Sequence, residues 1–183
     1  MNLAVACALV GLTLAFLLAA VWRGSRVPAE RASRPEGLAE ADLVYMEKLF
    51  RIHQPIRLAA KVDRVYRLPD GSLVLVELKM RGQDGLYLTD IIQLSAQRLA
   101  IEIQTGAVVE PYAFVSVLRP NREVRSHQVR LLDTTAVVAL YRRREAILAR
   151  RASPAYASTE SACPNCVLRS RCDRCRRWVK GVT

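Results

Sequence analysis

Three charged residues stand in a stretch that is otherwise largely apolar. Glu77 and Lys79 are two positions apart in Val76-Glu77-Leu78-Lys79. Asp63 lies earlier in the chain, on the other side of a predicted turn. Side chains alternate across a strand, so Glu77 and Lys79 would project from the same face. Charged groups on a buried strand are unfavourable unless they are paired or bind a metal. Two carboxylates and an ammonium group suit a site for Mg²⁺ or Mn²⁺ that activates water against a phosphate ester.

A β-hairpin is the element that would bring these residues together. Arg57 to Leu68 and Ser72 to Met80 are predicted as two strands joined by Pro69-Asp70-Gly71. Proline presets φ for a turn, and glycine accepts the positive φ needed to enter the next strand. A hairpin that turns at Asp70 places Asp63 beside Glu77. The run Leu73 to Val76 is apolar at every position, which predicts a central strand covered on both faces.

A purely structural interpretation of the same residues stays open. Asp63 and Glu77 could form an edge-strand cluster of salt bridges with Lys61, Arg64 and Lys79. A pattern as short as D…ExK does not by itself separate this alternative from a catalytic site.

The remaining elements predict an α/β domain with a central mixed sheet flanked by helices. Helical spacing of apolar residues predicts helices from Leu38 to Phe50, from Thr89 to Thr105 and from Thr134 to Arg151. Gly106 is expected to end the second helix. Two more strands are predicted from Ala113 to Leu118 and from Val124 to Leu132. The expected inward residues are Ile92, Ala96, Leu99 and Ile103 on the second helix, and Val137, Leu140, Tyr141 and Leu148 on the third.

The second predicted helix carries a polar line on an otherwise apolar surface. Asp90, Gln93, Gln97 and Gln104 fall on one stripe, from which Gln93 could reach the same pocket. The order Asp63, turn, Glu77-Leu78-Lys79, then Gln93 to Gln97, resembles the motifs of the RecB-type PD-(D/E)xK nucleases. It is most similar to the CRISPR-associated RecB-like exonucleases that carry an iron-sulfur cluster.

The resemblance extends over Leu38 to Trp178 and implies a restriction-endonuclease-like core. It implies a catalytic role for Asp63, Glu77, Lys79 and Gln93, with Mg²⁺ or Mn²⁺ held by Asp63, Glu77 and Leu78. Two positions depart from the family pattern. Gln97 stands where the family has Tyr, and the family's metal-binding His has no counterpart in the first helix. Glu40, Glu47, a water or nothing could complete the site in its place; His53 and His127 are weaker candidates for a metal ligand.

Four cysteines are clustered near the end of the chain, at Cys163, Cys166, Cys172 and Cys175. Clustered thiols in a short polar segment are typical of a metal site. The first three resemble the cysteine triplet of the iron-sulfur nucleases, which implies a [4Fe-4S] cluster. Structural Zn²⁺ and an unligated tail are the alternatives, and Cys175 is the expected fourth ligand.

An uncharged stretch from Leu3 to Trp22 is long enough to cross a bilayer as a helix. No basic residue precedes it, which favours a retained anchor over a cleaved signal peptide. Arg23, Arg26, Arg31 and Arg34 follow it, so the positive-inside rule places the rest of the chain in the cytoplasm. The predicted organisation is an anchor over residues 1–22, a flexible linker over 23–37, a nuclease core over 38–152 and a cysteine tail over 153–183.

The formal net charge is +11, and much of it lies between Arg142 and Lys180, which holds eleven basic and three acidic residues. Such a basic segment is typical of a polyanionic partner, either nucleic acid or an anionic membrane surface. Solvated helix faces and juxtamembrane charge are an equal alternative on charge alone. Arg142, Arg143, Arg169 and Arg171 are the predicted nucleic-acid contacts. We therefore expect a metal-dependent nuclease, acting on DNA at the cytoplasmic face of a membrane. The alternative is a membrane-anchored, catalytically weak module that binds nucleic acid.

Overall fold

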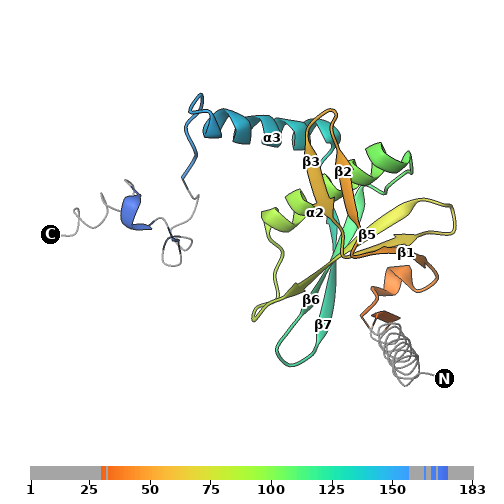
Figure 1. The fold of residues 1–183 in the computed structure, drawn as a ribbon. Helices are drawn as coiled ribbons and strands as arrows, with labels where there is room; N and C mark the ends of the chain where they lie inside the picture. Colours follow the sequence, from red (N-terminus) through yellow and green to blue (C-terminus); the bar gives the residue numbers. More distant parts are fainter. Residues whose placement is uncertain (1–29, 32, 157–162, 164–165, 168, 173–183) are drawn as a thin grey trace, which may run out of the picture. The chain divides into compact units, whose positions relative to one another are not determined.

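The computed structural model describes residues 30–31, 33–156, 163, 166–167 and 169–172, which divide into two compact units at Val138 and Ala139. The first unit holds a five-stranded mixed sheet in the order β1-β4-β5-β6-β7 and a separate β2-β3 ribbon. Figure 1 shows both. The strands are β1 (Asp42–Met46), β2 (Leu49–Ile52), β3 (Leu58–Lys61), β4 (Arg64–Arg67), β5 (Leu73–Met80), β6 (Tyr112–Leu118) and β7 (Val124–Arg130). The helices are η1 (Glu36–Leu38), α2 (Leu88–Thr105), α3 (Thr134–Leu148) and η3 (Arg169–Arg171). The expected α/β class with a central mixed sheet is confirmed.

The predicted hairpin before Glu77 is present. β4 and β5 pair antiparallel, with Arg64 opposite Val76 and Arg67 opposite Leu73. Asp70 Oδ1 accepts hydrogen bonds from the backbone N of Ser72 at 2.9 Å and from its Oγ at 2.8 Å. Gly71 has a φ of 89°, a conformation that favours glycine. Turn chemistry in the sequence therefore fixes the register on which the site depends.

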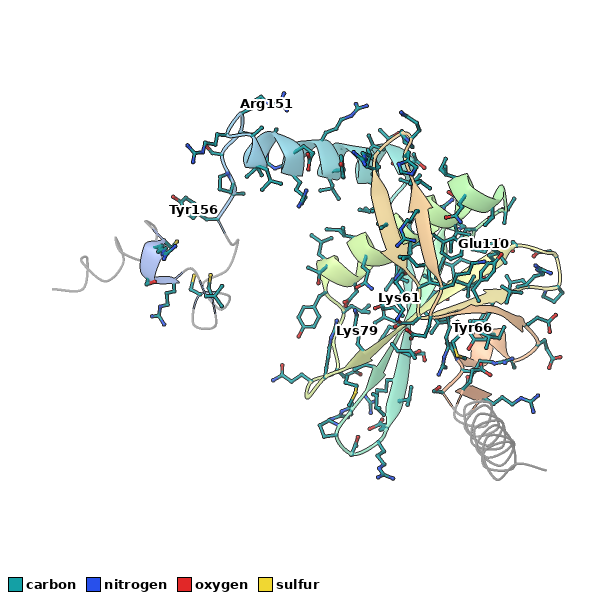
Figure 2. All side chains as sticks on the ribbon, viewed as in Figure 1. Lys61, Tyr66, Lys79, Glu110, Arg151 and Tyr156 are labelled. Atoms are coloured by element: carbon teal, nitrogen blue, oxygen red, sulfur yellow. The ribbon has the colours of Figure 1, made fainter. Side chains whose placement is uncertain are left out.

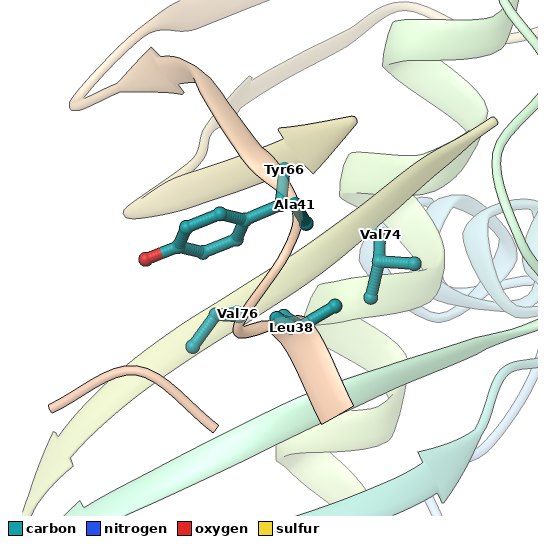
Figure 3. Packing of buried hydrophobic residues seen from close by; sticks show 5 residues of the cluster. All are labelled: Leu38, Ala41, Tyr66, Val74 and Val76. Atoms are coloured by element: carbon teal, nitrogen blue, oxygen red, sulfur yellow. The ribbon is translucent and has the colours of Figure 1, made fainter. Parts of the chain in front are cut away.

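β5 is a central strand, as predicted, with β4 antiparallel on one side and β6 parallel on the other. Val74 and Val76 pack in an apolar cluster with Leu38, Ala41 and Tyr66 (Figure 3). Because side chains alternate, Glu77 and Lys79 leave β5 on the opposite face. That face is the one from which α2 contributes hydrogen-bond partners to Glu77.

Helix α2 is present where it was predicted, and Gly106 ends it with a φ of 69°. The predicted inward face was partly wrong, because Ile103 is 52% exposed. Leu99 is buried as predicted, and Leu94, Ala100 and Ile101 are buried as well, together with Asp90 and Gln97. Asp90 and Gln97 of the polar line thus face inward, where Arg81 and Glu77 satisfy their side chains, whereas Gln104 is exposed.

The first predicted helix, Leu38 to Phe50, was wrong. After the short η1 the chain forms β1 and β2, which belong to different sheets. Val44 and Tyr45 favour strands, and Phe50 and Ile52 are buried at alternate positions of β2. Pairing with β4 and β3 outweighs the helical spacing that suggested a helix.

The strand predicted from Arg57 to Leu68 is also divided in two. β3 pairs with β2 in the ribbon, and β4 pairs with β1 and β5 in the main sheet. The break falls at the buried Val62 and at Asp63. Asp63 therefore lies where the chain passes from the ribbon into the main sheet, between β3 and β4.

The later elements follow the prediction, with differences at the surface. β6 and β7 form the expected hairpin, with Val115 opposite His127 and Val117 opposite Arg125. In α3 Val137 is buried, but Leu140 and Leu148 are 40% and 63% exposed, so their predicted inward position was wrong.

The N-terminal end of the described chain packs against the sheet through a buried ion pair. Arg34 donates to both carboxylate oxygens of Glu30, at 2.9 and 3.0 Å. Tyr66 donates its hydroxyl to Glu30 at 2.5 Å. Residues from Glu30 onward in the expected flexible linker thus make specific contacts. Within the described ranges no helix is long and apolar enough to cross a membrane; Leu3 to Trp22 lies outside them.

Candidate active site around Glu77

Glu77 is the centre of a buried polar cluster. Its side chain is 3% exposed, yet both carboxylate oxygens have partners. Oε1 accepts from Lys79 Nζ at 2.7 Å and from Gln93 Nε2 at 2.6 Å. Oε2 accepts from Gln97 Nε2 at 3.0 Å. A buried carboxylate with one cation and two amide donors is satisfied without leaving the sheet.

Lys79 and Gln93 close a triangle with Glu77. Lys79 Nζ donates to Gln93 Oε1 at 2.9 Å, in addition to Glu77. The predicted common face of Glu77 and Lys79 is confirmed, and so is the reach of Gln93 from α2 into their site. Lys79 is drawn on β5 in Figure 2, and about a quarter of its side chain is accessible, so the ammonium lies at the boundary between cluster and solvent.

Asp63 lies beside Glu77, as the hairpin register predicted. Arg64 pairs with Val76, and one further step along both strands sets Asp63 against Glu77. Asp63 Oδ2 accepts a hydrogen bond from the backbone N of Leu78 at 2.8 Å. Burial raises the pKa of Asp63, the hydrogen bond from Leu78 opposes this, and the negative charges of Glu77 and Glu47 raise it further. The negative charge of Glu77 thus disfavours the ionised form of Asp63.

Gln97 is a site residue whose contact the sequence did not reveal. It is 2% exposed, and Nε2 donates to the backbone O of Lys61 at 2.8 Å as well as to Glu77. It joins the strand before Asp63 to the carboxylate of Glu77. Its position on the polar stripe, one turn after Gln93, is the signal that could have identified it.

The other members of the predicted stripe bind elsewhere. Asp90 Oδ1 accepts from Arg81 Nη2 at 2.5 Å, in the loop that follows β5. Gln104 Oε1 accepts from the backbone N of Arg51 in the β2-β3 ribbon, at 2.7 Å. The stripe thus anchors α2 to three successive parts of the first unit, and only its middle section reaches the carboxylates.

The donor chemistry of this site fits a divalent cation. Mg²⁺ is usually bound by one or two carboxylates and retains several waters, and Asp63 and Glu77 supply two carboxylates at one point. No group of three His, Cys, Asp or Glu side chains arranged for a metal is found among the residues that the structure describes. Glu47 is an additional acid beside Asp63: its backbone N donates to the backbone O of Asp63 at 2.9 Å, and its carboxylate is paired with Lys61.

The other metal-ligand candidates lie apart from this cluster. His53 and Glu40 are exposed, His53 just after β2 and Glu40 just before β1. His127 Nε2 is 2.6 Å from Asp84 Oδ1, in a contact between β7 and the loop after β5. Glu47 is therefore the remaining protein candidate for the missing position.

The predicted residues of the C-terminal segment belong to the second unit. Arg142, Arg143, Arg169 and Arg171 are exposed there. Two backbone hydrogen bonds form turns at the described cysteines, Cys163, Cys166 and Cys172. Cys166 N donates to Cys163 O at 3.2 Å, and Cys172 N donates to Arg169 O at 3.3 Å. Cys175 lies outside the described residues.

The sequence matches no protein-family model and no curated protein. Two solved structures have a similar backbone. The protein SSO0001 has a TM-score of 0.46 and 17% identity, with 92% of this chain and 71% of that one covered. A candidate exonuclease from Eubacterium rectale has a TM-score of 0.45 and 13% identity, with 84% and 58% covered. The likeness is too low to say anything of chemistry.

Proposed function

We propose that the chain is a metal-dependent nuclease that hydrolyses phosphodiester bonds of nucleic acid, with DNA as the first substrate to test. The observation that carries this proposal is the meeting of Asp63 and Glu77 across the β4-β5 register, with Lys79 hydrogen-bonded to Glu77. Two repelling carboxylates at a buried position are more stable with a cation between them. A salt-bridge cluster would instead give each carboxylate a cation of its own.

Asp63 and Glu77 would hold Mg²⁺ or Mn²⁺, together with the backbone carbonyl of Leu78. Glu47 would join them as a ligand by giving up its exposed ion pair with Lys61 for the cation. Exposed ion pairs are weak, so little stability is lost in this exchange. When bound, the cation supplies Lewis-acid stabilisation of the phosphate and lowers the pKa of water.

The residues around the two carboxylates would orient the reacting groups. Lys79 Nζ, held by Glu77 and Gln93, is a fixed donor for charge that develops on the scissile phosphate. Gln93 and Gln97 would hold the carboxylate of Glu77 in one orientation through its two oxygens. Gln97 is thus a positioning residue.

The test is a cleavage assay of the full-length chain with Mg²⁺ or Mn²⁺ on single- and double-stranded DNA and RNA. Asp63→Ala and Glu77→Ala should abolish cleavage and leave affinity nearly unchanged, because phosphate contacts dominate affinity. Lys79→Ala should lose about 10²- to 10³-fold in rate. Glu145→Ala, which removes an exposed carboxylate in the second unit, is the matched control. Inactivity of the unaltered chain on every substrate would refute the proposal.

A binding module without strong catalysis is the second candidate. It is favoured by the hydrogen bonds that already occupy both oxygens of Glu77, and by the lack of a three-ligand group among the described residues. Nucleic-acid affinity without cleavage in any divalent metal would decide for it.

For the C-terminal segment we propose that Cys163, Cys166, Cys172 and Cys175 bind one metal centre, a [4Fe-4S] cluster with Zn²⁺ as the alternative. Cys163 and Cys166 are close in sequence, and the turn between them brings them close in space. Anaerobic purification should yield a brown protein with iron and sulfide. Stoichiometric zinc in a colourless protein would favour the alternative, and neither metal would refute the site.

We also propose that Leu3 to Trp22 anchors the chain, with both units in the cytoplasm. The arginines that follow this stretch support the orientation. A C-terminal reporter should be active only in the cytoplasm, and the purified protein should retain residues 1–22. A mature chain that begins after Trp22 would refute the anchor.

A further inference from the structure

The loop between β5 and α2 presents an exposed aromatic ring close to Lys79. Tyr87 is 49% exposed, and its apolar neighbours Leu86 and Leu88 are 43% and 67% exposed. Arg81 lies over the ring, with its guanidinium carbon 4.5 Å from the ring centroid. Since Arg81 covers one face of the ring, the other face is open to a flat partner.

This ring is held in place before any ligand arrives. Arg81 donates to Asp90 Oδ1 at 2.5 Å and to the backbone O of Gly85 at 2.8 Å. The backbone N of Tyr87 donates to Asp90 Oδ2 at 3.1 Å, and Asp90 is 2% exposed. The loop is thus tied to the first turn of α2 by a buried carboxylate, and little conformational freedom is lost when the ring is used.

The ring lies next to the candidate active site. Arg81 is two residues after Lys79, so it follows Glu77 and Lys79 on the same side of the chain. Hydrogen bonding to Asp90 raises the pKa of Arg81, and the charge of Glu77 adds to this rise. Gln93 is six residues after Tyr87 on α2, about 9 Å along the helix axis. Tyr87 is thus linked to the site through Arg81, which lies over its ring, and through α2, which carries Gln93, a partner of Lys79.

Basic side chains surround the same end of the sheet. The backbone N of Arg81 donates to Leu118 O at 3.1 Å, which joins the loop to the β6-β7 hairpin. Near its turn that hairpin carries Arg119, Arg122 and Arg125. Glu123 pairs with Arg119 and Arg125, and Asp84 pairs with Arg125. Val117 pairs with both Lys79 and Arg125, so these two cations share one face of the sheet. An exposed ring beside cations is the arrangement that binds single-stranded nucleic acid.

We propose that Tyr87, supported by Arg81, is a stacking platform for an unpaired nucleobase of the substrate. The inference rests on the proposed nuclease function and specifies a residue that binds its substrate. In a duplex the faces of the bases are covered by their neighbours, whereas a single strand offers an open base to the free face of the ring. The basic hairpin would follow the phosphates of that strand.

The experiment measures binding in the absence of cleavage. Full-length chain carrying Glu77→Gln is titrated, with EDTA, into labelled single-stranded DNA of about 12 nucleotides, into the same strand with abasic positions, and into the matched duplex. Tyr87→Ala and Tyr87→Phe are added to this background. Tyr156→Ala is the matched control, because Tyr156 is 52% exposed but belongs to the second unit.

Tyr87→Ala should weaken binding of the normal single strand by about 5- to 100-fold. Its binding of the abasic strand and of the duplex should change little, and Tyr87→Phe and Tyr156→Ala should bind like the parent. An equal loss on normal and abasic strands, or no loss at all, would overturn the inference. A melting curve for each variant confirms that Tyr87→Ala is folded, since its backbone bonds to Asp90 do not need the ring.

Cleavage by the chain without Glu77→Gln separates the two proposals. If it cuts DNA or RNA but Tyr87→Ala cuts and binds equally well, the nuclease function is supported and the stacking role of Tyr87 is refuted. If it cuts nothing while Tyr87→Ala still loses base-dependent affinity, the platform stands and the nuclease falls.

Discussion

Glu30 and Glu77 are both 3% exposed, yet they lie in different chemical surroundings. Glu30 accepts hydrogen bonds from Arg34, which donates to both carboxylate oxygens, and from the hydroxyl of Tyr66. Glu77 has one lysine and two amides, and a second carboxylate, Asp63, lies beside it. The two glutamates bond to opposite faces of the main sheet.

The pKa shifts at the two sites have opposite directions: the pKa of Glu30 is lowered and that of Asp63 is raised. Burial raises the pKa of Glu30, but hydrogen bonds from Arg34 and Tyr66 outweigh it, so the net shift is downward. The pKa of its partner Tyr66 is raised to about 12, by burial first and then by Glu30. At Asp63 burial and neighbouring carboxylates prevail, and the pKa is raised. A structural ion pair neutralises itself, whereas the Asp63-Glu77 pair retains a negative charge that can attract a cation.

The largest expected effect separates the two glutamates by activity. Glu77→Gln should lower the cleavage rate by about 10³-fold or more, because a metal ligand is lost. Glu30→Gln should cleave like the parent as long as the chain is folded. Rates are measured under single-turnover conditions with saturating Mn²⁺. Similar losses in both variants would mean that the two sites do not differ in role.

The next effect separates them by stability. Glu30→Ala leaves Arg34 buried without its carboxylate and should lower the free energy of unfolding by about 3 to 5 kcal/mol. Glu145→Ala removes an exposed pair with Arg144 and should change it by less than about 1 kcal/mol. Urea unfolding followed by circular dichroism measures both. If Glu30→Ala is too unstable to purify, the isosteric Glu30→Gln provides a milder loss, and an unchanged midpoint there would contradict the assignment.

The pH dependence of stability should follow the lowered pKa of Glu30. Its contribution is complete above the ordinary value of 4.5 and is lost as the pH falls through the lower pKa of the folded state. The difference in unfolding free energy between the parent and Glu30→Gln should therefore be constant from pH 7 to 5 and shrink at lower pH. A difference that stays constant down to pH 3 would show that ionised Glu30 is not what stabilises the fold.

Local signals explain which parts of the fold were predicted. The Pro69-Asp70-Gly71 turn fixes the β4-β5 register from within a few residues, so Asp63 could be placed beside Glu77 from sequence alone. The alternation of charged and apolar residues on β5 likewise placed Glu77 and Lys79 on one face. Gly106 gave the end of α2 in the same way.

Tertiary pairing explains what was missed. Residues 38–50 have helical spacing, but β1 and β2 form because distant strands, β4 and β3, pair with them. Ile103 was placed inside because an apolar face was assumed, whereas Asp90 and Gln97 are buried by partners on other elements. The ion pair of Glu30 with Arg34 has ordinary i,i+4 spacing, and nothing in that spacing shows that Tyr66 will cover it.

The smallest expected effect is a gain in stability at the active site. Asp63→Asn removes a charge that burial and two neighbouring carboxylates disfavour, while Asn can still accept the hydrogen bond from Leu78. Because the folded state raises the pKa of Asp63, stability is lost as the pH rises from the ordinary value of 3.8 through that raised pKa, and the variant should melt slightly higher than the parent at pH 7. The difference should vanish at pH values below the ordinary value of 3.8. Adding Mg²⁺ or Mn²⁺ should raise the melting temperature of the parent but not of Asp63→Asn, because only the parent keeps both carboxylates. A variant that melts lower than the parent in EDTA would place Asp63 with Glu30, as a carboxylate that holds the fold together.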